Sequence, residues 1–146
     1  MNILSVDDSR MIRMIIANTV KSLGYDILEA EDAEVGLEVI KENYPDIDLI
    51  LLDWNMPGMS GYDLLKILKS NDTYNSIPIM MVTTEGERQN VVKAIQQGAS
   101  NYLTKPFTPE DLSTKILECL GKGMMDAEDD LDDFGDLDDF GDLDDI

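Results

Sequence analysis

Five short apolar runs alternate with five stretches of helical hydrophobic spacing, and this alternation constrains the fold more than any other feature of the sequence. Strands that alternate with helices pair in parallel, because each helix carries the chain back across the sheet. We therefore expect an α/β fold, a doubly wound (βα)5 unit whose five-stranded parallel sheet is covered on both faces. The expected strands lie near residues 2–6, 26–30, 48–53, 77–83 and 101–104, and the expected helices near 10–23, 33–43, 60–70, 87–97 and 109–120.

Residues that favour helix ends stand at these boundaries. Side chains that cap helix N-termini precede the first, second, third and fifth helical stretches, and Pro109 follows the last of them at a position that suits proline. Glycines that suit helix C-termini follow the first and fourth stretches. The expected N-caps are Ser9, Asp32, Ser60 and Thr108, and the expected C-terminal glycines are Gly24 and Gly98.

The acidic charge is concentrated at the C-terminal end. Residues 124–146 contain 12 acids and no base, in a six-residue repeat LDDFGD, whereas residues 1–123 contain 19 acids and all 11 bases. We expect residues 1–121 to form one domain and residues 122–146 to be an acidic, low-complexity tail that is disordered in isolation. Both parts would repel nucleic acid, and no apolar run reaches the roughly 18 residues of a membrane span.

Composition limits the available chemistry. The chain has no histidine and a single cysteine, Cys119, which lies in a helical apolar pattern and is interpreted as a core residue. Without histidine, the usual serine and cysteine triads and most zinc sites are excluded. One cysteine cannot form an internal disulfide, and the N-terminus has no signal-peptide pattern, so we expect a cytoplasmic protein.

Polar side chains follow four of the five predicted strands. Asp7 and Asp8 follow the first, Asp53 ends the third, Thr83 ends the fourth and Lys105 follows the fifth. The carboxyl ends of parallel strands form one crevice, so these groups should converge there. Carboxylates about 4 Å apart repel by about 4 kcal/mol per pair at an effective dielectric near 20. Oxygen ligands without histidine or cysteine favour Mg²⁺, and a carboxylate beside it can accept a phosphoryl group.

Four motifs in this order resemble the receiver domain of response regulators. They are VDDS at 6–9, LLDWNMPGMSG at 51–61, VTTE at 82–85 and NYLTKPF at 101–107. The similarity covers about residues 1–121 and is greatest with single-domain chemotaxis regulators. It implies a flavodoxin-like sheet with strand order 2-1-3-4-5 and a phosphoacceptor signalling protein rather than an enzyme acting on a separate substrate.

The resemblance also implies roles for individual residues. Asp53 is the expected phosphoacceptor, and Mg²⁺ is bound by Asp8, Asp53 and the backbone carbonyl of Asn55, with Asp7 helping through water. Thr83 is the switch hydroxyl, and Lys105 contacts the phosphoryl group and precedes Pro106 in a cis peptide. The output surface is expected to include Tyr102, Val91 and Lys115, and Asn55 and Glu85 tune dephosphorylation.

The same resemblance implies partners. A sensor histidine kinase donates the phosphoryl group, and the expected target is a flagellar motor switch protein or another protein, bound by the surface formed by the fourth helix, fifth strand and fifth helix. No DNA-binding or enzymatic domain follows residue 121, so output should be protein binding by a monomer. The acidic tail resembles short acidic peptides that bind receiver output surfaces. One hypothesis is that it folds back near Lys115 and Lys93; others are a tether for a protein or cations, and a solubilising disordered tail.

Three other functions are compatible with parts of the pattern. A dehalogenase-type phosphatase also uses an aspartyl nucleophile, but it needs a second acid two residues later, where this chain has Asn55. A flavodoxin-like nucleotide binder needs a glycine-rich loop after the first strand, which is absent. A pseudo-receiver that binds proteins without phosphorylation would not need the complete set of acids.

Overall fold

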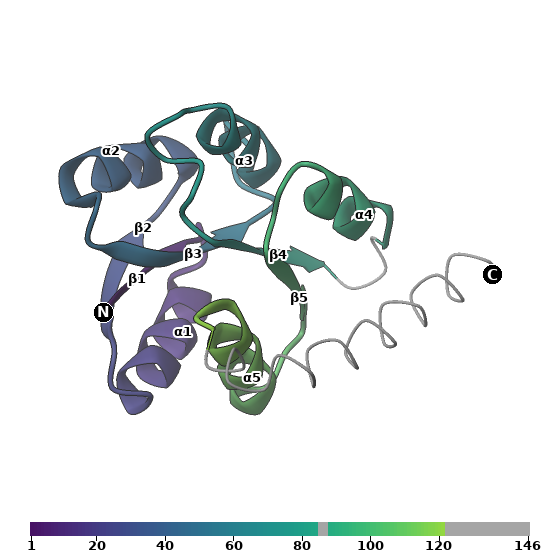
Figure 1. Ribbon diagram of the computed structural model, residues 1–146. Helices are drawn as coiled ribbons and strands as arrows, with labels where there is room; N and C mark the ends of the chain where they lie inside the picture. The colour runs from purple at the N-terminus through teal and green to yellow at the C-terminus, as the bar shows by residue number, and fades with distance from the viewer. Residues whose placement is uncertain (85–87, 122–146) are drawn as a thin grey trace.

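The computed structural model describes residues 1–84 and 88–121, and within these ranges strands and helices alternate as expected (Figure 1). The fourth strand begins two residues later than predicted, at Ile79 rather than Ile77, because Pro78 between them has no N–H for the sheet ladder. The other predicted ends coincide with those of the structure or differ by one residue. The strands are β1 (Asn2–Val6), β2 (Asp26–Ala30), β3 (Ile47–Asp53), β4 (Ile79–Thr84) and β5 (Asn101–Lys105), and the helices are α1 (Arg10–Ser22), α2 (Ala33–Asn43), α3 (Gly61–Lys69), α4 (Arg88–Gln96) and α5 (Pro109–Cys119).

The five strands form one parallel sheet in the order β2-β1-β3-β4-β5, which is the expected order. β3 is central and pairs with β1 on one side and β4 on the other. The register aligns Val6 of β1 with Leu52 of β3, and Asp53 of β3 with Val82 of β4. The C-terminal ends of β1, β3 and β4 therefore lie side by side at one edge of the sheet.

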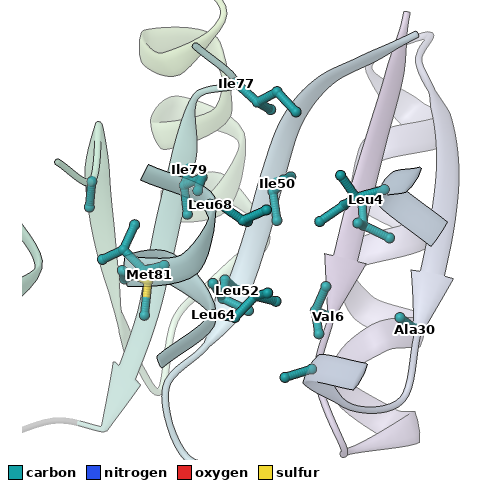
Figure 2. Close-up of a cluster of buried hydrophobic side chains, with 14 of the residues drawn as sticks. Leu4, Val6, Ala30, Ile50, Leu52, Leu64, Leu68, Ile77, Ile79 and Met81 are labelled. Carbon is teal, nitrogen blue, oxygen red and sulfur yellow. The ribbon is translucent and has the colours of Figure 1, made fainter. Parts of the chain in front are cut away.

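Helices cover both faces of the sheet, and each face has its own apolar core (Figure 1). Alternate residues of a strand point to opposite faces, so Ile50 and Leu52 of β3 join one core while Leu49 and Leu51 join the other. Figure 2 shows Leu52 packed against Leu64 of α3, and Ile50 beside Leu68 of the same helix. Helices α2, α3 and α4 contribute to this first core, and α1 and α5 contribute to the second.

The residues predicted to cap the helices are confirmed. Each expected N-cap side chain accepts a backbone N–H from the third residue of its helix, and the two glycines adopt the left-handed conformation, with φ of +87° at Gly24 and +109° at Gly98.

Cys119 is half-buried and packs against the second core, and burial raises the pKa of its thiol to about 11. Among the helices of the described part, none is both long and apolar enough to cross a membrane.

Candidate functional site

Three carboxylates converge at the C-terminal edge of the sheet. Because Val6 is in register with Leu52, the next residues, Asp7 and Asp53, are brought together at the ends of β1 and β3. One carboxylate oxygen from each of Asp7, Asp8 and Asp53 lies within 4.8 Å of the other two. Asp7 and Asp53 are almost fully buried, with 1% and 4% of their surfaces exposed, whereas Asp8 is exposed. The predicted convergence of these acids is observed.

Lys105, the last residue of β5, reaches the same cluster. Its Nζ donates a hydrogen bond to Asp53 Oδ1 over 3.3 Å and lies 3.3 Å from Asp7 Oδ2. The peptide between Lys105 and Pro106 is cis, as the resemblance implied. One ammonium thus faces the two buried carboxylates and neutralises part of their charge.

Burial and charge repulsion act on Asp53 together. Desolvation first, and then the charge of Asp7, raise the pKa of Asp53 from 3.8 to about 6, although Lys105 acts in the opposite direction. One ammonium is therefore insufficient to compensate for the clustered carboxylates. The site is electrostatically suited to a further cation.

Two buried oxygen atoms of the site accept no hydrogen bond from the described residues. Asp7 Oδ1 accepts the N–H of Ser9 over 2.8 Å, but Asp7 Oδ2 has only the ion-pair contact with Lys105, whose geometry is not that of a hydrogen bond. The hydroxyl of Thr83, which follows the β4 residue in register with Asp53, is the other. Buried polar atoms normally have partners. An oxygen-only donor set with an unsatisfied carboxylate oxygen fits a hard divalent cation such as Mg²⁺.

The predicted switch residues lie farther along the sheet. Tyr102 of β5 is in register with Met81 of β4 and is half-buried, and the Nζ of Lys115 lies 4.7 Å from the centre of its ring. Burial, and next the charge of Glu118, raise the pKa of Tyr102 above its usual value. Val91 of α4 is buried, with 6% of its surface exposed, so its side chain faces the protein interior rather than the solvent.

The exposed apolar residues of α4 are Val92 and Ile95, which were not among the residues predicted for the output surface. Asn55 is exposed in the loop after β3, and the role of its backbone carbonyl as a ligand stays a prediction. Glu85 and the acidic tail lie outside the described residues.

A glycine lies directly against the backbone of Asp53. A Cβ on Gly61, the first residue of α3, would lie 1.9 Å from the backbone oxygen of Asp53, so no other residue fits without moving that strand end. The Gly61 N–H also donates to the carbonyl of Trp54 over 2.9 Å. The sequence showed this glycine in the loop after β3 but did not indicate what it contacts.

An aromatic stack borders the site. The ring of Trp54, the residue after Asp53, stacks on Tyr62 with centroids 4.8 Å apart and planes at 15°, and the Nζ of Lys66 lies 4.9 Å from the Tyr62 ring centre. Trp54 is half-buried. As the single tryptophan of the chain, it provides a fluorescence signal next to the acids.

Comparisons with known proteins agree with this geometry. A family model for the response regulator receiver domain matches residues 3–117. The chain is 45% identical over 122 residues to the chemotaxis protein CheY1 of Helicobacter pylori, covering 83% of this chain and 98% of that protein. It is 43% identical over 124 residues to a chemotaxis protein CheY homolog of Campylobacter jejuni, covering 84% and 95%. The solved structure of Vibrio cholerae CheY4 matches with a TM-score of 0.75 at 33% identity, over 82% of this chain and 98% of that one.

Proposed function

The chain belongs to the response regulator receiver domain family, and on that premise we propose that it is a phosphorylation-activated regulator of chemotaxis. Residues 1–121 act as the receiver and residues 122–146 as a separate acidic tail. The observation that carries the proposal is the contact of one lysine, Lys105, with two buried carboxylates, Asp7 and Asp53, at the end of the sheet. Two carboxylates that are buried together with only one cation lower the stability of the fold, and such costly arrangements are typical of sites that bind charged groups.

Asp53 is the proposed nucleophile. Its free carboxylate oxygen forms a bond to the phosphorus of a phosphohistidine in a sensor kinase, the P–N bond breaks, and the imidazole leaves with the bonding electron pair. The raised pKa of Asp53 leaves the group mostly ionised at neutral pH, as a nucleophile must be. Lys105 Nζ already lies 3.3 Å from Asp53 Oδ1, so after phosphorylation the ammonium can contact the phosphoryl oxygens with little movement.

The acids would hold Mg²⁺, which neutralises phosphoryl charge when bound. Asp8 and Asp53 are the proposed direct side-chain ligands, Asn55 supplies its backbone carbonyl, and Asp7 contributes through water. The unsatisfied Oδ2 of Asp7 supports that last assignment, because a metal-bound water would give it the hydrogen bond that it lacks.

Thr83 and Tyr102 are the proposed switch. The buried Thr83 hydroxyl has no partner among the described residues, so a hydrogen bond to a phosphoryl oxygen would satisfy it. Thr83 and Tyr102 lie on the paired strands β4 and β5, so movement of the hydroxyl can be transmitted to the ring and to Lys115 above it. The proposed output is binding of a flagellar motor switch protein by the α4–β5–α5 surface of a cytoplasmic monomer.

Incubation with acetyl phosphate and Mg²⁺, followed by intact-protein and peptide mass spectrometry, tests the proposal. The expected result is the mass of one phosphoryl group on the peptide that contains Asp53, dependent on Mg²⁺ and absent from Asp53→Asn. Asp48→Asn, a substitution on the same strand away from the acids, is the matched control. A chain that gains no mass under these conditions would be a protein-binding pseudo-receiver instead.

A further inference from the structure

One arginine outside the acidic cluster donates a hydrogen bond to the backbone of an acid in the cluster. Arg13, in the second turn of α1, donates from Nη1 to the carbonyl oxygen of Asp7 over 2.5 Å and from Nε to Glu29 of β2 over 3.2 Å. Its side chain is 15% exposed, against 44% for Glu29. The hydrogen bond to Asp7 is thus partly buried, whereas the ion pair with Glu29 is exposed to solvent.

The carbonyl that Arg13 holds belongs to the peptide between Asp7 and Asp8. The N–H of Asp7 is bonded to Ala30 over 3.1 Å, and its Oδ1 accepts from Ser9. With its carbonyl bonded to Arg13, Asp7 has only Oδ2 left to face the site. Asp8 is different, because its side chain is exposed and its carboxylate accepts no hydrogen bond from the described residues.

We propose that Arg13 is a positioning residue of the acidic site. By fixing the peptide plane between Asp7 and Asp8, it presets the direction in which the otherwise unrestrained Asp8 side chain leaves the backbone, and it holds the last free oxygen of Asp7 in place. Mg²⁺ then binds to ligands whose backbone is already ordered. The inference rests on the proposed function of the site, in which Asp8 is a direct ligand.

Charge and positioning predict opposite effects for Arg13. A guanidinium beside the acids repels a divalent cation, so if Arg13 acted through its charge alone, removing it would tighten Mg²⁺ binding. If Arg13 acts by ordering the Asp7–Asp8 peptide, removing it would weaken binding, because the ligands must then be ordered by the metal. The sign of the change in affinity distinguishes the two.

The test is Mg²⁺ affinity at constant ionic strength, measured by Trp54 fluorescence and by calorimetry on the full chain. We expect Arg13→Met, which keeps the apolar stem, to weaken Mg²⁺ binding about tenfold, as is typical when a partner behind a metal ligand is lost. Arg13→Lys keeps the charge but cannot make both bonds, and should weaken it severalfold. Arg10→Met removes an exposed charge from the same helix and should leave affinity unchanged or slightly higher.

Glu29→Gln separates the two bonds of Arg13. It removes the exposed ion pair but leaves the bond to Asp7, so its effect should be smaller than that of Arg13→Met. An affinity of Arg13→Met equal to or tighter than that of the unsubstituted chain would overturn the inference, and if that variant does not fold, an unchanged affinity of Arg13→Lys would do so. Failure of the unsubstituted chain to bind Mg²⁺ would instead refute the proposed function itself.

Discussion

Replacing Asp53 with asparagine should stabilise the metal-free protein at neutral pH. The pKa of Asp53 is raised from 3.8 to about 6. A difference of about two units, at 1.36 kcal/mol each, corresponds to a penalty of about 3 kcal/mol for holding the charged form. Asparagine resembles the protonated form of Asp53, and the lost attraction to Lys105 is already included in the net shift of the pKa. The expected gain in the free energy of unfolding at neutral pH is therefore about 3 kcal/mol.

The sign of the pH dependence follows from the raised pKa. Above about pH 6 the folded protein holds the unfavourable charge, so the penalty is fully present. As the pH falls from about 6 toward 3.8, the folded state takes up its proton before the unfolded chain does, and the penalty disappears. The advantage of Asp53→Asn should therefore be largest near neutral pH, fall to about 1 kcal/mol at about pH 4.5 and approach zero below the unfolded pKa of 3.8.

Urea unfolding of both proteins with a metal chelator, at about pH 7.5 and about pH 4.5, measures this difference. Addition of Mg²⁺ at the higher pH should stabilise the unsubstituted chain more than the variant, because the bound ion removes the repulsion that the variant no longer has. Equal stability of the two proteins at neutral pH, or a difference that stays constant on acidification, would refute the electrostatic reasoning.

Three further predictions concern other parts of the site. Gly61→Ala should lower the free energy of unfolding by about 3 kcal/mol in urea titrations, because the added Cβ would overlap the Asp53 carbonyl. The control Gly58→Ala, at a position with φ of +77° and open space around it, should lower it by about 1 kcal/mol. A smaller loss at Gly61 than at Gly58 would contradict the packing argument. Thr83→Val removes a buried hydroxyl without a described partner, so unfolding should show equal or up to about 1 kcal/mol higher stability, and a clear loss would reveal a bond that the hydroxyl makes. Lys105→Met removes the cation that lowers the pKa of Asp53, so a carboxyl NMR titration should place that pKa above about 6, and a lower value would mean that another cation replaces the lysine.

Most of the fold could be predicted from sequence because its signals are local. Apolar runs, helical spacing and capping side chains act within a few residues, and the caps at Ser9 and Thr108 are made as expected. The start of β4 was the clearest error, since the missing N–H of Pro78 outweighed the apolar pattern around it. The strand order came from resemblance to a family, because hydrophobic pattern alone does not say which strands are neighbours.

The convergence of the acids followed from one rule, that parallel strands end at the same edge of the sheet. That rule placed Asp7, Asp53 and Lys105 together, as the structure has them. It could not place Val91, whose side chain turns inward on α4, because the orientation of a helix depends on the core against which it packs.

The sequence by itself determined which chemical groups are available, namely carboxylates, a hydroxyl and an ammonium with no histidine, and at which strand ends they stand. Only the tertiary structure decided how these groups are balanced: that Asp53 is buried enough for its pKa to reach about 6, that Gly61 contacts its backbone, and that Arg13 holds the peptide of Asp7. Burial, close approach and hydrogen bonding depend on distances between residues that are far apart in the chain, and those distances are established only when the helices pack onto the sheet.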